Sequence, residues 1–502
     1  MQLIARAKTF PSRIAIVDEV GEWSYEELLR ESARQARGLL GGAADLLEEP
    51  IAFLVPPGFA HVALQWGIWR AGGIAVPLCL SHPAPELAHV LDDAGIRRAF
   101  CTPQLRRRLE PLLKGRSLTL EVVEAPGRRG SEPTPPAAPS ALPAVGPERR
   151  ATIIYTSGTT GKPKGVVSTH GNLEAQVSTL VEAWRWSRED HILNVLPLHH
   201  VHGIVNVLAC ALWSGAVWET LPRFDAEEVW RRFESRPLTL FMAVPTIYHR
   251  LIQAFEGFPE RRRQELAAAA RGLRLMVSGS AALPVPVLKR WHGITGHVLL
   301  ERYGMTEIGM ALSNPYEGPR VAGHVGQPLP GVEVRRVDAQ GKDVARDGQE
   351  GELLVRGAAV FQEYWQRPEE TARAFRGGWF ATGDVAVIED GSYRLLGRSS
   401  VDILKTGGYK ISALEIEAAL REHPAIEDCA VVGLSDPQWG QVVACAAVAA
   451  AQPVPSLEDL QAWARDRLAP YKAPRKLLLV DDLPRNALGK VVKARVAELF
   501  RR

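Results

Sequence analysis

The chain has 502 residues, of which 46% are hydrophobic and 23% are charged. These fractions exclude a disordered or fibrous chain, and the length allows about two to four domains. The chain carries 60 Lys and Arg residues against 57 Asp and Glu residues, a formal net charge of +3. This balance excludes the strongly basic surface that would bind nucleic acid or an anionic membrane. No stretch approaches the roughly 20 consecutive apolar residues of a membrane span, so we expect no membrane-spanning segment.

The cysteines and the N-terminal residues bear on the cellular compartment. Five cysteines lie far apart, at Cys79, Cys101, Cys210, Cys429 and Cys445. An odd and scattered set argues against a disulfide framework and against a zinc site. The first residues contain no apolar core of a signal peptide. We therefore expect a cytoplasmic protein, or one of the mitochondrial matrix if a transit peptide precedes this sequence.

The N-terminal part of the chain has the pattern of a layered α/β protein. Ser24 and Glu27 have the spacing of a capping box, and the apolar residues that follow at helical intervals predict a helix. Further along, three apolar runs predict buried strands, at residues 51–55, 73–78 and 238–244. Short β-branched runs alternate with helical patterns over most of the length, which is typical of α/β layering.

Two segments mark candidate boundaries. Residues 126–150 contain seven prolines and little periodicity, which predicts a linker or a long surface loop. A second boundary is expected near Arg398. Before it lie two strand-like segments, at residues 352–355 and 393–396, separated by loops rich in Gly and Asp, and after it the pattern of a compact α+β unit begins.

The residues after Arg398 have the pattern of a compact α+β unit. Its expected elements are a helix at 412–420, strands at 429–433 and 442–449, and a helix that begins with a box-like cap at Ser456. We therefore expect a large N-terminal body of layered α/β sheets over residues 1–398 and a small α+β C-terminal domain over residues 399–502.

A run of hydroxyl, glycine and lysine residues, TSGTTGKPKG, begins at Thr156 directly after a strand-like segment. The glycines let several backbone N–H groups converge on an anion, and two lysines add positive charge, which suits a triphosphate. The run is not a Walker A loop, because two residues instead of four separate Gly158 from Gly161, and Pro163 stands where Ser or Thr is required.

This loop resembles the phosphate loop of the adenylate-forming superfamily, which contains acyl-CoA synthetases, peptide-synthetase adenylation domains and luciferases. Seven further segments resemble that family's motifs in its order: LPLHHVHG (196–203), VSGSAALP (277–284), ERYGMTE (301–307), FATGD (380–384), LLGR (395–398), KTGGYKIS (405–412) and PRNALGK (484–490). The resemblance covers essentially the whole chain. It implies a two-step reaction in which a carboxylate attacks the α-phosphate of Mg-ATP and a thiol then displaces AMP to give a thioester. The implied substrates are a small carboxylate, ATP and CoA, the implied metal is Mg²⁺, and the small C-terminal domain is implied to be mobile.

The resemblance also assigns roles to residues of this chain. For ATP it implies a phosphate cradle, adenine contacts from Tyr303 and the backbone around Ser278, and ribose contacts from Asp384 and Arg398. The cradle residues are Thr156, Ser157, Gly158, Thr159, Thr160, Gly161 and Lys164. Thr306 is implied to contact the α-phosphate and Glu307 to bind Mg²⁺. Singly, Glu307 is also consistent with a helix-end carboxylate, Asp384 with a turn and Arg398 with a surface ion pair.

The C-terminal motifs carry three further implications. Lys490 resembles the catalytic lysine that enters the site for adenylation, where its charge stabilises the developing anion, although a lysine near a terminus is usually only solvated. Gly407 and Gly408 resemble the segment that lines the pantetheine tunnel, with a simple turn as the alternative. The hinge of the family lies within residues 399–402, where this sequence is one residue longer than usual, so no single residue is assigned.

Arg302 is the informative position for the acid substrate, because the corresponding side chain lines the acyl pocket of the family. A buried arginine without an anion is costly, by roughly 3–5 kcal/mol, and its guanidinium can pair bidentately with a second carboxylate. Together with Ser280, His200 and His202 this resembles the malonyl-CoA synthetase branch, with His202 expected to contact the distal carboxylate. His200 is implied to lie near the acyl pocket and to belong to the catalytic residues with Lys490, Thr306 and Glu307. The alternative for Arg302 is an ion pair with Glu301 or another carboxylate.

We therefore expect a malonate–CoA ligase, with methylmalonate as a candidate second substrate. The competing functions are a short- or medium-chain or aryl acyl-CoA synthetase, a stand-alone adenylation enzyme that loads a carrier protein, and a non-catalytic nucleotide-binding scaffold. The sequence does not predict an oligomeric state.

Overall fold

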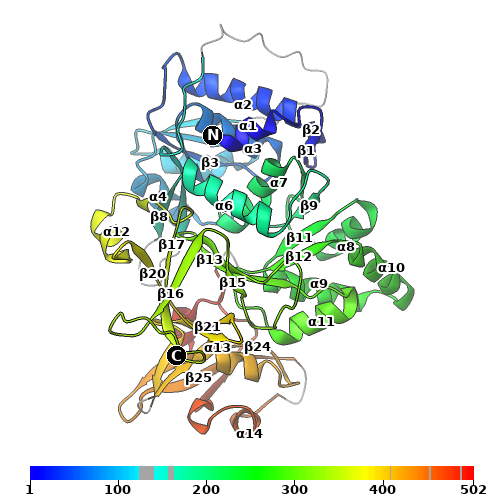
Figure 1. Ribbon diagram of the computed structural model, residues 1–502, viewed down its shortest axis with the longest axis vertical. Coiled ribbons are helices and arrows are strands. Elements are labelled where there is room, and N and C mark those ends of the chain that lie inside the picture. The colour runs from blue at the N-terminus through cyan, green and yellow to red at the C-terminus, as the bar shows by residue number, and fades with distance from the viewer. Residues whose placement is uncertain (124–140, 157–162, 407–408, 451–453, 487–488, 502) are drawn as a thin grey trace.

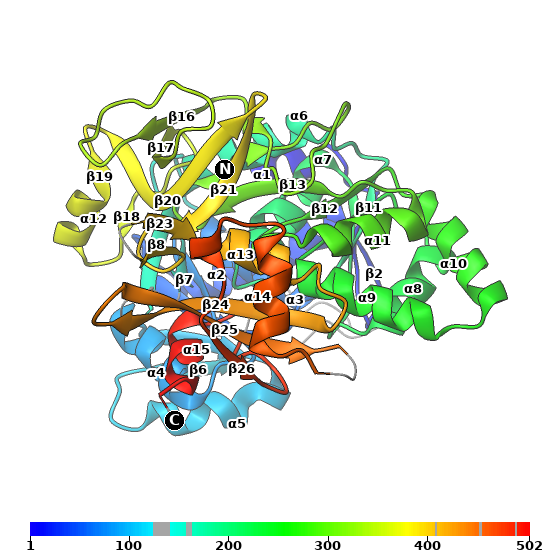
Figure 2. The same cartoon turned by 90° about the horizontal axis from the view of Figure 1, so that it is seen from below.

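The computed structural model describes residues 1–123, 141–156, 163–406, 409–450, 454–486 and 489–501. Three sheets and their helices make up a large body that ends with β21, and one further sheet with three helices makes up a smaller C-terminal part. In Figure 1 the C-terminal part lies below the body, and Figure 2, seen from below, shows it in front of the body. This arrangement confirms the predicted mixed α/β class with a large N-terminal body and a small C-terminal α+β unit.

The largest sheet has nine strands and is parallel except at its two edges. In spatial order its strands are β15 (Gln327–Pro328), β14 (Gly309–Ser313), β13 (Leu300–Met305), β12 (Leu275–Ser278), β11 (Leu240–Ala243), β9 (His191–Asn194), β10 (Val217–Thr220), β1 (Ile14–Val17) and β2 (Glu22–Ser24). Its central strands are buried on both faces, which explains their continuous apolar runs. Ligands of such sheets bind outside the carboxyl ends of the strands, where Ser278 ends β12.

A second sheet has seven strands. In spatial order these are β18 (Glu363–Tyr364), β8 (Lys164–Thr169), β7 (Arg150–Thr156), β4 (Ile74–Pro77), β3 (Pro50–Leu54), β5 (Arg98–Cys101) and β6 (Thr119–Val122). The short strand β18 pairs with β8 and sets Tyr364 opposite Val166. Because of this pairing, the segment after residue 360 lies at the edge of the sheet, next to the strand that begins with Lys164.

Two five-stranded sheets complete the β structure. The sheet of the body contains β16 (Val332–Val337), β17 (Gly351–Gly357), β19 (Phe375–Arg376), β20 (Trp379–Glu389) and β21 (Ser392–Arg398). The sheet of the C-terminal part contains β22 (Ile403–Thr406), β23 (Tyr409–Ser412), β24 (Ile426–Asp436), β25 (Gly440–Ala449) and β26 (Lys476–Leu479).

Helices cover the sheets and join their strands. The α-helices are α1 (Gln2–Ala7), α2 (Tyr25–Leu40), α3 (Phe59–Arg70), α4 (Ala84–Asp93), α5 (Arg106–Leu109), α6 (His170–Ala183), α7 (Cys210–Ser214), α8 (Ala226–Ser235), α9 (Pro245–Gly257), α10 (Glu260–Arg271), α11 (Val285–Thr295), α12 (Pro368–Ala374), α13 (Ala413–Leu420), α14 (Leu457–Arg465) and α15 (Lys493–Leu499). Three 3₁₀ turns and one π-helix are η1 (Pro103–Leu105), η2 (Glu110–Leu113), η4 (Pro470–Lys472) and the π-helix η3 (His202–Ala209). Among the described residues, no helix is long and apolar enough to cross a bilayer.

The locally predicted elements are confirmed. The Ser24 hydroxyl accepts a hydrogen bond from the Glu27 amide, and the Glu27 carboxylate accepts one from the Ser24 amide, so the predicted capping box begins α2. The helices expected after Ser412 and Ser456 begin there as α13 and α14. The predicted loop at 126–150 is one residue too long, since Arg150 begins β7, and its residues 126–140 lie outside the described part.

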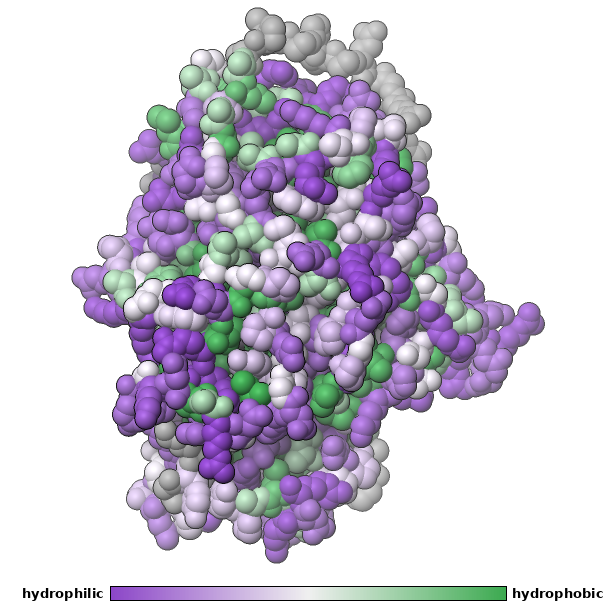
Figure 3. Space-filling model, in the orientation of Figure 1, coloured by the Kyte–Doolittle hydropathy of each residue, from purple (hydrophilic) through white to green (hydrophobic). Residues whose placement is uncertain are grey.

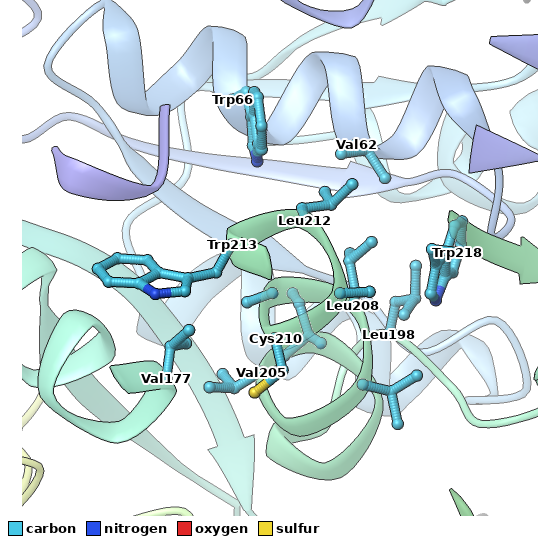
Figure 4. Close-up of a cluster of buried hydrophobic side chains, with 14 of the residues drawn as sticks. Val62, Trp66, Val177, Leu198, Val205, Leu208, Cys210, Leu212, Trp213 and Trp218 are labelled. Atoms are coloured by element: carbon cyan, nitrogen blue, oxygen red, sulfur yellow. The ribbon is translucent and has the colours of Figure 1, made fainter. Parts of the chain in front are cut away.

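The largest hydrophobic core lies between α3 and the continuous helical segment formed by η3 and α7. Figure 4 shows Val62 and Trp66 of α3 pointing toward Leu212 of α7, with Leu208 and Trp218 beside them. Each π-helical turn holds an extra residue, a geometry that is frequent at functional sites. Charged and polar side chains cover most of the face in Figure 3, including the tip formed by α10, and apolar residues form separate patches.

Candidate active site

Several of the predicted site residues lie close together in the described part of the chain. Ser278 ends β12, Arg302 and Tyr303 lie on the neighbouring strand β13, and Asp384 on β20 is directly opposite Arg398 on β21. The positive charges of Arg398 and Arg302 both act on Lys490 of the C-terminal part. Residues more than 180 positions apart in the chain therefore share one site.

The residues expected to bind the nucleoside form a hydrogen-bonded group. The Tyr303 hydroxyl donates to Oδ2 of Asp384 at 2.6 Å, and Nε of Arg398 donates to Oδ1 at 3.2 Å. The Asp384 amide donates to the Thr382 hydroxyl at 3.0 Å, which fixes the backbone of this residue. Burial, followed by the charge of Asp384, raises the pKa of Tyr303 well above its usual value, so the phenol is a neutral donor. A carboxylate has about four acceptor positions, so Asp384 can accept further hydrogen bonds from a ribose.

The residues expected near the phosphates surround a buried carboxylate. Glu307 follows Thr306 in the turn after β13 and accepts a hydrogen bond on Oε1 from the Tyr364 hydroxyl at 3.0 Å. Burial raises the pKa of Glu307 above its usual value. Lys164 pairs with Glu370 and holds its ammonium 5.2 Å above the ring of Tyr364. Thr156 is half-buried at the end of β7, whereas the predicted phosphate-cradle residues 157–161 lie outside the described residues.

The donor set near Glu307 fits Mg²⁺. Glu307 is 6% exposed, and the positive charge of Arg398 acts on its carboxylate. Mg²⁺ is usually held by one or two carboxylates together with substrate phosphates and water, not by a cage of protein ligands. The described residues contain no cluster of three or more His, Cys, Asp or Glu side chains that could hold a metal ion.

Arg302 lies buried with unsatisfied donors. It is 4% exposed, and its Nε and Nη2 atoms are buried without a hydrogen-bond partner among the described residues. Residues 301 and 302 point to opposite faces of β13, and the Glu301 carboxylate accepts instead from the Gly323 amide at 3.0 Å. The alternative in which Arg302 pairs with Glu301 is therefore wrong. Burial lowers the pKa of Arg302 to about 9.

Ser280 and His202 lie beside this arginine. Nδ1 of His202, at the start of η3, is 3.1 Å from the Ser280 hydroxyl, and its Nε2 is buried without a partner among the described residues. Burial, followed by the charge of Arg302, lowers the pKa of His202 well below its usual value, so the ring is neutral. Ser280 has a φ of +69°, a left-handed conformation that is uncommon for a residue other than glycine. The buried Ser278 hydroxyl also has no partner in the described structure.

His200 lies next to this group. Burial lowers the pKa of His200 well below its usual value, and His199 and Lys490 lower it further. Its ring lies 4.1 Å from that of His199, centroid to centroid. His200 is therefore a neutral imidazole held against a second imidazole.

Lys490 is presented to the site by a closed turn. The Lys490 amide donates to Oδ1 of Asn486 at 3.0 Å, and Nη1 of Arg485 donates to the Gly489 carbonyl at 2.7 Å. Gly489 has a φ of +76°, and a Cβ atom there would lie 3.1 Å from the Thr246 hydroxyl at the start of α9, so the turn packs against the body. Lys490 is an exposed residue. Desolvation of its ammonium by the surrounding protein, followed by the charges of Arg398 and Arg302, lowers its pKa to about 8.

The segment expected to contain the hinge is tied to the end of β21 by Asp402. Oδ2 of Asp402 accepts from the Arg398 amide at 3.0 Å, and Oδ1 lies 3.5 Å from Nζ of Lys493. The location of the hinge within 399–402 stays a prediction. Gly407 and Gly408, expected at the pantetheine tunnel, lie outside the described residues.

Sequence patterns did not single out Tyr364 or Gly279. Tyr364 reaches Glu307 because β18 pairs with β8. Gly279 lies against the guanidinium of Arg302, and a Cβ atom there would overlap its Cζ and Nη1 atoms. Each contact depends on strand pairing between distant segments, which no local spacing reveals.

Two family models match the sequence of this chain. Residues 3–365 match the model of the AMP-binding enzyme, and residues 415–490 match that of the AMP-binding enzyme C-terminal domain. The chain belongs to the AMP-binding enzyme family. The resemblance to adenylate-forming enzymes that the motifs indicated is thus confirmed.

Relatives within the family share nearly the whole chain. The mitochondrial malonate–CoA ligase ACSF3 of Xenopus laevis is 46% identical over 99% of this chain and 92% of its own length. The malonate–CoA ligase of Arabidopsis thaliana is 42% identical over 96% of this chain and 85% of its own length. The crystal structure of ATP-bound MatB from Rhodopseudomonas palustris superposes with a TM-score of 0.89 at 32% identity, covering 100% of this chain and 99% of MatB.

Proposed function

We propose that this AMP-binding enzyme joins malonate to coenzyme A, with methylmalonate as a candidate second substrate, through an acyl-adenylate that forms with release of pyrophosphate. The buried Arg302 with two unused donors is the observation that carries this proposal. A guanidinium so placed needs an anion, and the distal carboxylate of a short dicarboxylate supplies one. The names of the relatives in Xenopus and Arabidopsis support the same acid.

The distal carboxylate is held by groups that are already in place. Arg302 offers two donors to it, and the neutral His202 offers its Nε2 when the Ser280 hydroxyl donates to Nδ1. A monocarboxylate would leave Arg302 buried and unpaired, which disfavours its binding. The reactive carboxylate then projects toward Lys490, on which the charge of Arg302 acts.

In the first step an oxygen of the reactive carboxylate attacks the α-phosphorus of ATP and pyrophosphate leaves. Lys490 stabilises the negative charge that develops between carboxylate and phosphate, and Thr306 binds an α-phosphate oxygen. Lys164 leaves Glu370 to contact the outer phosphates, together with Thr156 and residues 157–161. Mg²⁺ held by Glu307 would neutralise phosphate charge. Tyr303, Ser278, Asp384 and Arg398 hold the nucleoside.

In the second step the thiol of CoA attacks the acyl carbon and AMP leaves, which gives the thioester. We propose that residues 399–502 act as a mobile domain against a body of residues 1–398, with a hinge in 399–402 and with Gly407 and Gly408 lining the path of the thiol. His200, neutral and next to the acid pocket, remains beside the acyl group in both steps. We also propose a reducing compartment, the cytoplasm or the mitochondrial matrix, since all five cysteines are free thiols.

The test is pyrophosphate release with ATP and Mg²⁺ across acetate, propionate, butyrate, benzoate, malonate, methylmalonate and succinate, with and without CoA. Turnover confined to malonate and methylmalonate, with AMP formation that depends on CoA, is the expected result. Turnover dominated by monocarboxylates would keep the two-step chemistry and overturn the assignment of Arg302. Turnover with a carrier-protein thiol and none with CoA would move the enzyme to the carrier-loading class.

A further inference from the structure

The turn that presents Lys490 is tied to the start of β24 by Arg485. Nη1 of Arg485 donates to the Gly489 carbonyl at 2.7 Å, and its Nη2 forms an ion pair with Oδ2 of Asp428. One planar guanidinium therefore contacts both the residue before Lys490 and a strand residue 57 positions earlier in the chain. Arg485 also forms an isolated antiparallel bridge with Val491, which closes the turn at its two ends.

The carboxylate of Asp428 is itself held in place. Nε of Arg421, the residue that follows α13, donates to Oδ1 of Asp428 at 2.9 Å, so each carboxylate oxygen contacts one guanidinium. Nη2 of Arg421 donates to the Cys429 carbonyl at 2.7 Å and lies 3.4 Å from Oε2 of Glu417. The side chains of Arg421 and Glu417 are 17% and 4% exposed. Because charge-assisted bonds between buried groups have a fixed geometry, Asp428 offers Arg485 a fixed partner.

The start of β24 also contacts α9 of the body. The register of β24 against β25 shifts within residues 426–428, and such an irregularity changes the direction of a side chain. Oε1 of Glu427 accepts a hydrogen bond from Nε2 of Gln253 at 3.3 Å and lies 3.6 Å from Nε2 of His249. Both partners lie on α9, and Thr246 of the same helix faces the Lys490 turn. The ion pair of Arg485 thus joins this turn to a strand end that is docked on the body.

We propose that Arg485, fixed by Asp428, is a positioning residue that holds Lys490 in the site while the acid is activated; this inference rests on the proposed function of Lys490. A charge stabilises a transition state best when its position is fixed before the reaction. The Lys490 ammonium ends a flexible four-carbon side chain, so its position depends on the turn that carries it. Lys490 takes no part in the attack of the thiol, and that step therefore does not need Arg485.

The test measures the two half-reactions of the full-length enzyme separately. Adenylation is followed by pyrophosphate release with the acid that gives the highest turnover, and the thiol step by thioester formation from the prepared adenylate of that acid and CoA. Arg485→Met should lower kcat for adenylation by roughly tenfold to 100-fold, with little change in the KM for ATP, and leave the thiol step unchanged. Asp428→Asn should cause a smaller loss of the same kind.

Two comparisons separate positioning from a general loss of structure. In Lys490→Ala the amine is absent, so adding Arg485→Met should cost no further adenylation activity, whereas a structural defect would add a loss of its own. Arg467→Met is the matched control, because this arginine of the C-terminal part lies over the ring of Trp463, with its Cζ 3.5 Å from the centroid. It should change neither half-reaction.

A second measurement reports on the turn without turnover. The Gly489 and Lys490 amides both donate to Asn486, and their hydrogen exchange, followed by mass spectrometry, should be roughly tenfold faster in Arg485→Met than in wild type. Unchanged exchange, equal losses in both half-reactions, unchanged adenylation, or a further loss in the double variant would each overturn this inference alone. Adenylation by Lys490→Ala at the wild-type rate would overturn the proposed function of Lys490 and this inference with it.

Discussion

Gly279 packs closely against the guanidinium of Arg302. A Cβ atom at residue 279 would overlap Cζ and Nη1 of Arg302 and lie 2.8 Å from its Nε. Arg302 is buried, so the surrounding protein leaves its guanidinium little room to move away from residue 279. The absence of a side chain at residue 279 therefore leaves room for the guanidinium of Arg302 in its present position.

The first prediction follows from this contact. Gly279→Ala should displace Arg302 and lower kcat/KM for malonate by roughly 100-fold, the effect of a misplaced binding group, while the KM for ATP changes little. Gly38→Ala is the matched control, because nothing lies within 4 Å of a Cβ atom at that helical position. Steady-state kinetics with each substrate varied in turn measures both effects, and unchanged malonate kinetics in Gly279→Ala would contradict the inferred role.

The second prediction concerns the other face of β13. Burial raises the pKa of Glu301 to about 8, so the folded protein holds this carboxyl protonated at neutral pH. Since this pKa is raised above that of the unfolded chain, its contribution to stability is complete below about pH 4 and declines until about pH 8. The glutamine of Glu301→Gln is neutral at every pH. The free energy of unfolding of this variant should therefore increase relative to wild type as the pH rises, by up to about 1.4 kcal/mol per pH unit. Urea denaturation at pH 5, 6.5 and 8 measures the difference; a constant offset would show that Glu301 is ionised in the fold.

The third prediction is a pH dependence of the adenylation step. The pKa of Lys490 is about 8, and only the protonated amine stabilises the developing anion. Raising the pH through this value removes its charge, so kcat/KM for malonate in pyrophosphate release should fall above about pH 8. Lys490→Ala should lose most adenylation activity and lose this alkaline limb, yet still form thioester from prepared malonyl-adenylate and CoA. A wild-type profile that stays flat to pH 9.5 would be inconsistent with the role given to Lys490.

The fourth prediction concerns Tyr364, whose hydroxyl donates to Glu307 at 3.0 Å. Tyr364→Phe removes a hydrogen bond that favours the ionised carboxylate, so the pKa of Glu307 should rise further and Mg²⁺ should compete less well with a proton. We expect the Mg²⁺ concentration for half-maximal activity to increase by roughly three- to tenfold, most at low pH. Calorimetry of Mg-ATP binding gives a readout apart from turnover. Tyr393→Phe removes a hydroxyl elsewhere in the same hydrophobic cluster and should change neither value.

Local sequence signals account for much of the fold. The capping boxes at Ser24 and Ser456 involve residues three positions apart, so their pattern is visible in the sequence and the helices begin there. The apolar runs of β3 and β4 are likewise local, because both faces of these strands are buried. The motif order also predicted one site for Tyr303, Asp384 and Arg398, and hydrogen bonds join these three residues in the structure.

Contacts between distant segments of the chain could not be predicted from local sequence patterns. Tyr364 lies 57 residues from Glu307 in the sequence and meets it only through strand pairing at a sheet edge. The alternative partner of Arg302, Glu301, could be rejected only when the structure showed its hydrogen bond to Gly323. The packing of Gly489 against Thr246 depends on how two parts of the chain meet, which spacing alone does not specify.

The most direct test of the central claim compares two acids in one variant. Arg302→Met keeps the side chain long and removes its charge, and kcat/KM for malonate and for butyrate is measured by pyrophosphate release in wild type and variant. If Arg302 binds the distal carboxylate, malonate should lose roughly 100-fold or more while butyrate is unchanged or improved. Equal losses for the two acids, with ATP binding intact, would contradict the pairing of Arg302 with a second carboxylate.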